Sequence, residues 1–287
     1  MDSLAAARSR DVKNPSKTCA FPCAFNSLIS TQASSKNPSS MNREYHAWFS
    51  PKLQRTMELL VFGHAGEKIL VFPTRDGRFH EYEDLRITEA LRPWIDAGKM
   101  QLVCLDNIAH ESLYCFWCRP QDRFLRYLAY ENYVLDEVLP WLIERYPSGE
   151  MTAHGLSMGA FFATNFALRN PAQVRRLVAF SGRYDLTHAV EHFSDLLEGY
   201  YDDTVYFNTP LHFLPNLEQG ELLADLRNIH VTLAVGREDP FLQQNVDLHH
   251  ILLAKGVRSE LHIWDGRAHQ GGAWRRMAPL YVPSSAA

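Results

Sequence analysis

A serine between two glycines is the group in this sequence whose setting most clearly suggests chemistry. Gly155, Ser157 and Gly159 form a G-x-S-x-G pattern between an apolar run and an amphipathic helical pattern. A serine on a tight strand-to-helix turn has a strained backbone, so its neighbours two residues away must lack bulky side chains. The following helix would direct N–H groups and the positive end of its dipole toward the hydroxyl. The pattern predicts a nucleophile elbow at Ser157; a glycine-rich turn with an ordinary serine is the alternative.

A serine hydroxyl is a weak nucleophile unless a base removes its proton, and behind such an elbow the acid and the histidine follow in that order. His269 lies on a glycine-rich loop after the last apolar run, and we predict it as the base. Asp239 comes just after the apolar run 230–235 and is predicted to orient the imidazole. Glu238 is the alternative acid, and Asp239 could instead cap a helix that starts near Pro240.

Attack by a serine on a carbonyl creates an oxyanion, which two N–H donors must stabilise. The backbone of Met158, the residue after the serine, is expected to supply one donor. The second is expected from the loop after the apolar run 68–72, through the main-chain N–H of Thr74 or Arg75, with Arg75 slightly favoured. A surface charge and a side-chain contact with substrate are alternative roles for Arg75. This chemistry needs no metal and no cofactor.

The elements that would hold these residues alternate along the chain. Apolar runs predict strands at 57–62, 68–72, 101–105, 150–154, 174–180, 230–235 and 259–264. Helical periodicity predicts helices at 84–98, 121–146, 158–170, 242–255 and 273–281. Strands that alternate with helices favour an α/β fold, with a mostly parallel sheet covered on both faces. Residues 184–229 interrupt this alternation, and we expect a short cap-like excursion above the sheet.

Aromatic side chains in and near the excursion are candidates for the walls of a substrate pocket. Tyr201 and Tyr206 belong to an aromatic stretch that also holds Asp202 and Asp203, and Trp117 follows another predicted strand. Apolar and aromatic walls are typical of small-molecule sites. The alternative is a cap that packs its own small core. Two adjacent carboxylates without histidine or further acids favour a solvated turn over a metal site.

Composition excludes several classes of protein. A net charge of −4 and 22% charged residues give no reason to expect nucleic acid or a membrane surface as a partner. No apolar stretch approaches the ~18 residues of a membrane-spanning helix. The five cysteines, including the pair Cys115 and Cys118, do not look like a disulfide framework. They favour reduced thiols in a cytoplasmic protein, and a redox or zinc role for that pair is the alternative.

One segment carries a family resemblance. Residues 130–185 resemble the putative-esterase family of α/β-hydrolases, which includes S-formylglutathione hydrolases, feruloyl-esterase domains, enterochelin esterases and mycolyltransferases. The shared features are a helix with Glu131, Glu137 and Pro140, the elbow with Met158, and the stretches Arg-Asn-Pro at 169–171 and Ser-Gly-Arg-Tyr-Asp at 181–185. Many relatives carry a His-Gly motif where this chain has Pro73-Thr74-Arg75-Asp76-Gly77, and Gln270 is also a departure. The resemblance implies acyl-ester chemistry on an α/β-hydrolase fold, without naming a substrate.

These observations predict one α/β-hydrolase domain over residues 41–287, after a disordered tail or over-extended start at residues 1–40. We expect a serine esterase that cleaves small-molecule carboxylic esters through Ser157, His269 and Asp239. The alternatives are an acyltransferase with a non-water acceptor and a non-catalytic binding scaffold. Oligomeric state is not predicted.

Overall fold

A computed structural model describes residues 41–284 of the chain. The tail predicted at residues 1–40 and the cysteines Cys19 and Cys23 lie outside the described residues. No helix within residues 41–284 combines the length and the apolar character that crossing a bilayer requires.

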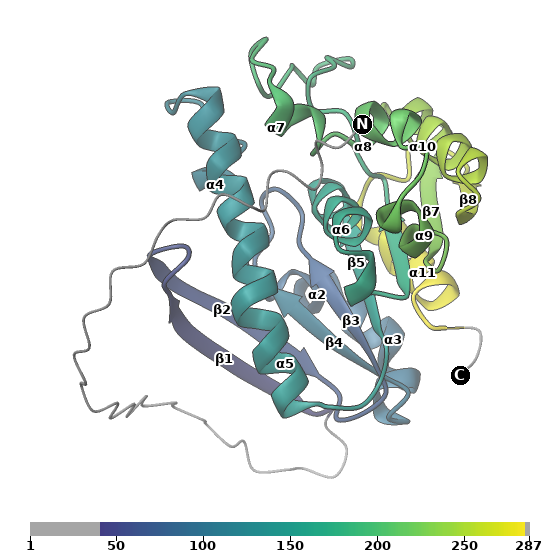
Figure 1. The fold of residues 1–287 in the computed structure, drawn as a ribbon. Helices are drawn as coiled ribbons and strands as arrows, with labels where there is room; N and C mark the ends of the chain where they lie inside the picture. Colours follow the sequence, from purple (N-terminus) through teal and green to yellow (C-terminus); the bar gives the residue numbers. More distant parts are fainter. Residues whose placement is uncertain (1–40, 285–287) are drawn as a thin grey trace, which may run out of the picture. The chain divides into compact units, whose positions relative to one another are not determined.

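An eight-stranded sheet forms the centre of the described region (Figure 1). Its order is β1-β2-β4-β3-β5-β6-β7-β8. The strands span Arg43–Ser50, Arg55–Phe62, Glu67–Phe72, Met100–Leu105, Met151–Leu156, Arg176–Phe180, His230–Gly236 and Arg258–Trp264 for β1 to β8. The two pairings of β2, with β1 and with β4, are antiparallel, and all later pairings are parallel. The predicted mostly parallel sheet is confirmed.

Helices cover both faces of this sheet, as predicted. Alternate side chains of the strands point to opposite faces, so Leu70 and Phe72 join one core cluster while Ile69 and Val71 join the other. The first cluster lies under α4 (Pro120–Tyr133), α5 (Leu139–Arg145), α6 (Met158–Arg169) and α10 (Leu242–Ala254), and Figure 1 shows α4, α5 and α6 in front of the sheet. The second lies under α2 (Glu81–Asp84), α3 (Ile87–Asp96) and α11 (Gly271–Tyr281).

The structure differs from the predicted elements in three places. β1 was not predicted, because only His46 and Ser50 of this edge strand are buried. The helix predicted at 84–98 is two helices, since Arg86 adopts a left-handed conformation with φ of 56° between α2 and α3. The helix predicted at 121–146 is continuous in outline, but a π-helical turn at Val134–Val138 separates α4 from α5.

Two glutamates of the family motif have structural partners. Glu137 accepts hydrogen bonds from the Trp48 indole and the Ser50 hydroxyl, which ties β1 to the helix. Glu131 is buried and accepts hydrogen bonds from Arg169 and Asn170 at the end of α6. The motif therefore joins three separate elements rather than contributing to a reaction.

The interruption at residues 184–229 is confirmed as a region of short elements. It contains α7 (Asp203–Tyr206), α8 (Pro210–Phe213) and α9 (Glu221–Leu226), and no strand of the sheet. The adjacent aspartates begin α7 instead of lying in the predicted turn: Asp203 is its first residue, and Asp202 caps it by accepting the Val205 N–H at 2.9 Å. The other oxygen of Asp202 accepts from Tyr200.

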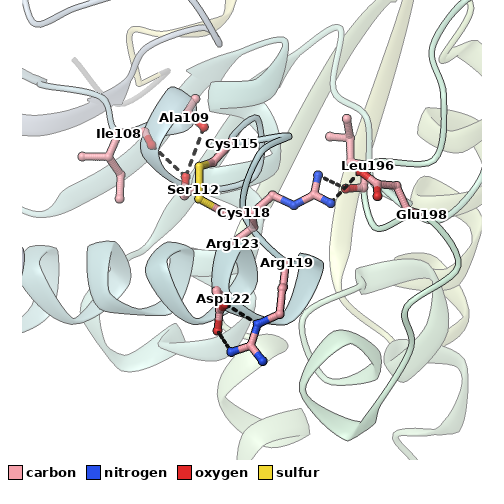
Figure 2. Close-up of a disulfide and its surroundings, with 10 residues drawn as sticks. All are labelled: Ile108, Ala109, Ser112, Cys115, Cys118, Arg119, Asp122, Arg123, Leu196 and Glu198. Atoms are coloured by element: carbon pink, nitrogen blue, oxygen red, sulfur yellow. Dashed lines mark hydrogen bonds and ion pairs between the residues drawn. A yellow bond between two sulfur atoms is a disulfide. The ribbon is translucent and has the colours of Figure 1, made fainter.

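The prediction of reduced thiols is wrong for Cys115 and Cys118, which form a disulfide (Figure 2). A turn brings them together, because the N–H of Cys118 donates to the carbonyl of Cys115. The number and spacing of the cysteines, on which the prediction depended, do not reveal this turn. Cys104, in β4, is a free buried thiol as predicted. Figure 2 also shows the fully buried Arg123 beside the disulfide, bonded to the carbonyl of Leu196 and to Glu198.

Candidate active site

Ser157 lies at the sharp turn between β5 and α6. Its backbone has φ of 53° and ψ of −116°, a conformation that residues other than glycine rarely adopt. The Ser157 N–H donates to the carbonyl of Phe180 at 2.9 Å, which holds the turn to the end of β6. The strained turn that the sequence predicts is therefore present.

The two flanking glycines are required by close backbone contacts. A Cβ on Gly155 would lie 2.1 Å from the carbonyl oxygen of Gly159, and a Cβ on Gly159 would lie 2.1 Å from that of Phe72. Phe72 is the last residue of β3, so the start of α6 is packed directly against the beginning of the loop that follows β3. The lack of a side chain at these two glycines lets the elbow pack closely against that loop.

His269 and Asp239 meet Ser157 in an unbroken chain of hydrogen bonds. His269 lies on the loop between β8 and α11, and its Nε2 is 2.9 Å from the Ser157 hydroxyl oxygen. Its Nδ1 is 2.9 Å from Oδ2 of Asp239. Since a carboxylate can only accept, Nδ1 carries the proton and the neutral ring leaves Nε2 free to accept the serine proton. The arrangement can activate a hydroxyl as a nucleophile.

Asp239 contacts both the histidine and the backbone ahead of α10, but the N-cap of that helix is Phe241 and not Asp239. Oδ1 of Asp239 accepts the N–H of Phe241 at 3.0 Å ahead of α10, while Oδ2 faces His269. The carboxylate of Asp239 is fully buried, whereas the neighbouring Glu238 is exposed. Phe241 and Trp274 flank the imidazole, with ring centroids 6.0 and 5.4 Å away. These contacts fix the ring in one orientation.

The expected oxyanion donors can now be separated. In the described part of the chain, neither the Met158 N–H nor the Arg75 N–H has a hydrogen-bond acceptor. The Thr74 N–H is already used, because it donates to Oε2 of Glu81 at 2.9 Å. The Thr74 N–H is thus engaged within the protein, whereas the Arg75 N–H is not, and the assignment of the second oxyanion donor stays a prediction.

The comparisons with known proteins concern the family and the fold. The sequence profile of the family described as "Putative esterase" matches residues 50–274, most of the chain. The chain belongs to the putative esterase family. No curated protein matches it in sequence. The predictions of an α/β-hydrolase fold and of a carboxylic ester hydrolase are confirmed.

Solved structures resemble this esterase in fold at low sequence identity. A ferulic acid esterase has a TM-score of 0.66 and 18% identity, with 85% of this chain and 97% of that chain covered. A fluorophosphonate-binding serine hydrolase from Staphylococcus aureus has a TM-score of 0.65 and 15% identity, with 84% and 97% covered. An S-formylglutathione hydrolase from Agrobacterium tumefaciens has a TM-score of 0.64 and 16% identity, with 85% and 96% covered.

The side chain of Arg75 is not a free cation in this esterase, because it is paired within the protein. Its guanidinium bonds Asp76 at 2.9 Å and lies over the ring of Tyr114, 5.1 Å from the ring centre. Tyr114 thus packs beside the predicted oxyanion loop. The only sequence feature that suggests this position for Tyr114 is that it follows β4 in the chain.

The aromatic residues predicted to bind substrate are not brought to the serine by any contact among the described residues. The Tyr201 hydroxyl is 2.9 Å from Nδ1 of His212, and the Tyr206 hydroxyl accepts from Asn216. Trp117, between the two disulfide cysteines, is 81% exposed. Their role in substrate binding therefore stays a prediction.

Glu81 is a residue of the site that the sequence did not reveal. Burial raises the pKa of its carboxyl, although the hydrogen bonds from the Thr74 hydroxyl and N–H act in the opposite direction. A half-buried acid bonded to a backbone N–H of the loop after β3 would have been a signal. That signal requires the fold of the loop after β3, which no local pattern encodes.

Proposed function

We propose that this esterase cleaves carboxylic esters through a Ser157–His269–Asp239 triad and an acyl-enzyme intermediate. The single observation that supports the proposal is the hydrogen-bonded chain from Ser157 Oγ through both nitrogens of His269 to the buried Asp239. General base, nucleophile and orienting acid lie within hydrogen-bond reach of each other, as triad chemistry requires.

The reaction proceeds in two halves. Ser157 Oγ forms a bond to the ester carbonyl carbon while its proton passes to His269 Nε2, and the carbonyl electrons move onto oxygen. Collapse of this intermediate breaks the bond to the alkoxy group, which takes the proton from His269 and leaves as an alcohol. Water then repeats the attack on the acyl-enzyme, with His269 again as base, and releases the carboxylic acid and Ser157.

The backbone N–H groups of Met158 and Arg75 are proposed to stabilise the negative oxygen in both halves. Met158 is the first residue of α6, so the positive end of the helix dipole adds to the effect. Asp239 stabilises the imidazolium that forms on His269. No cofactor is needed for these steps.

The test is substitution of the nucleophile. Ser157→Ala should lower p-nitrophenyl acetate hydrolysis by at least about 10³-fold without changing the urea unfolding midpoint by much. Ser259→Ala is the matched control, since it removes a hydroxyl that only meets His249. A fluorophosphonate should label wild-type protein at Ser157, as located by peptide mass spectrometry. Turnover by Ser157→Ala at the wild-type rate would contradict the mechanism.

Substrate and cellular setting are also proposals. The modest net charge of −4 supports a small-molecule ester substrate, without nucleic acid or a membrane as partner. We propose the cytoplasm as the location, against which the Cys115–Cys118 disulfide is the opposing observation. Fluorescence of a tagged chain in cells would test the location. Product analysis with and without an added alcohol would separate hydrolysis from acyl transfer.

A further inference from the structure

Polar contacts hold the loop after β3 to its neighbours, among them the bonds of Arg78 to the buried Asp106. The loop residues Arg75 to Arg78 border a cavity of about 180 Å³, together with Asn107 and His110. The ion pair between His110 and Asp76 spans this side, but both side chains are more than half exposed, so it contributes little. Polar contacts from buried side chains must therefore decide the shape of the loop.

Asn107 makes the largest set of such contacts. Its side-chain nitrogen lies within hydrogen-bond distance of three carbonyl oxygens of the loop, those of Thr74 at 2.5 Å, Arg75 at 2.9 Å and Gly77 at 3.1 Å, and shares its two N–H donors among them. Its side-chain oxygen accepts the Ala109 N–H, which fixes the amide in this orientation. The side chain is only 9% exposed. The side-chain amide of Asn107 thus contacts three of the backbone carbonyl groups in the loop after β3.

The contact between Asn107 and the Thr74 carbonyl also determines the direction of the Arg75 N–H. The carbonyl of Thr74 and the N–H of Arg75 belong to one peptide unit, and in a trans peptide they point in opposite directions. No cis peptide bond occurs in the described residues. Because the Thr74 carbonyl points at Asn107, the Arg75 N–H points away from Asn107.

The order of the sheet places the elbow on that opposite side. β3 lies between β4 and β5. Asn107 follows the end of β4 by two residues, and Ser157 follows the end of β5 directly. An N–H on the β3 loop that points away from the β4 side therefore points toward the β5 side, where the nucleophile is.

Glu81 holds the other end of the same turn. Its carboxylate accepts the Thr74 N–H and the Thr74 hydroxyl. It also lies where a Cβ on Gly77 would be, since that atom would come within 2.4 Å of the carboxyl carbon. Glu81 thus engages the Thr74 N–H and packs its carboxyl group against Gly77.

We propose that Asn107 and Glu81 are positioning residues that aim the Arg75 N–H at the developing oxyanion. The inference rests on the proposed function, because it requires acyl transfer to Ser157. Neither residue touches the substrate; both act through the backbone of the loop.

The first experiment substitutes Asn107. Asn107→Ala should lower kcat for p-nitrophenyl acetate about 10- to 100-fold, approaching the loss of a full oxyanion donor, with KM within about threefold. The affinity for a trifluoromethyl ketone should fall by a similar factor. In that complex Ser157 Oγ bonds the ketone carbon, the carbonyl electrons become an oxyanion, and the serine proton moves to His269. A merely structural asparagine would not weaken this adduct selectively.

Asn208→Ala is the matched control. Asn208 is also buried and also donates to a backbone carbonyl, that of Thr204 at 2.8 Å, but it lies in the excursion. It should lose stability in urea unfolding while keeping kcat. Folded Asn107→Ala with kcat within about twofold of this control, or with only KM raised, overturns the inference.

Glu81 provides a second test that does not depend on the folding of an Asn107 variant. Glu81→Ala should lower kcat about tenfold, and Glu81→Gln should recover most of that loss because its amide oxygen still accepts the Thr74 N–H. Equal activity of the two variants would also overturn the inference. The proposed function fails separately: wild type and Asn208→Ala would then neither turn over esters nor take a fluorophosphonate at Ser157.

Discussion

The carboxylate of Asp239 is fully buried and lies 2.9 Å from Nδ1 of His269. Replacing it by the isosteric amide in Asp239→Asn would present an N–H₂ or a weaker acceptor to Nδ1, so the ring would favour the wrong tautomer. We predict that kcat for p-nitrophenyl acetate falls on the order of 10⁴-fold.

Glu238→Gln is the control for this change, because it makes the same chemical replacement on the exposed neighbour. It should keep wild-type kcat. Equal losses in the two variants would mean that charge near the loop, rather than the Asp239–His269 contact, controls the rate.

Gly159→Ala should damage both stability and activity. The new methyl group would meet the carbonyl oxygens of Phe72 and Pro73 at 2.1 and 2.5 Å, so α6 or the loop after β3 must move. We expect a loss of about 1–3 kcal/mol in the free energy of unfolding and a lower kcat. Gly272→Ala is the control, since its methyl group would meet no atom within 4 Å. Urea unfolding and ester hydrolysis of both variants check the prediction.

His154 should make the fold sensitive to mild acid. Burial lowers the pKa of His154 from 6.5 to about 4. Between those values the unfolded chain binds the proton and the folded chain does not, so stability falls as the pH drops from about 6.5 toward 4. The full effect is on the order of 3 kcal/mol, and below pH 4 this group adds no further change.

His154→Leu should flatten this dependence, because the substituted side chain cannot take up a proton. Urea unfolding of wild type and variant at pH 7.5 and pH 5 measures the difference between the two slopes. Parallel pH dependence in both proteins would assign the acid sensitivity to other groups.

Reduction of the Cys115–Cys118 disulfide should have a modest effect on stability. A loop this short loses little chain entropy when it is closed, so its opening should cost ~2 kcal/mol in the free energy of unfolding. The double variant Cys115→Ala/Cys118→Ala should be that much less stable and should no longer respond to dithiothreitol. A response of the double variant to the reductant would point to another thiol.

The central part of the fold could be predicted because its signal is local. The strands of the sheet's interior are buried along most of their length, and β4, which is buried throughout, appears as a largely apolar run in the sequence. β1 gave no such signal, since it alternates exposed and half-buried side chains at the edge. The break between α2 and α3 depends on the left-handed backbone of Arg86, a residue type that gives no warning of it.

The site divides in the same way. Ser157, Asp239 and His269 follow strand ends in an order that the chain itself displays, so they could be predicted as a set. Asn107 is separated from Thr74 by 33 residues, and its contact exists only because β4 lies beside β3 in the sheet. The proposal of Arg75 over Thr74 as the second oxyanion donor uses that neighbour relationship. It could not be made from the residues after β3 alone.

Trp274 donates its indole N–H to the Ser181 hydroxyl and lies edge-on to His269, with ring centroids 5.4 Å apart. A protonated imidazole quenches indole fluorescence on contact, whereas a neutral one does so weakly. The esterase thus carries an optical probe beside its own base. The difference in emission between wild type and Trp274→Phe would follow each protonation of His269 in real time, without a dye and without a chromogenic ester.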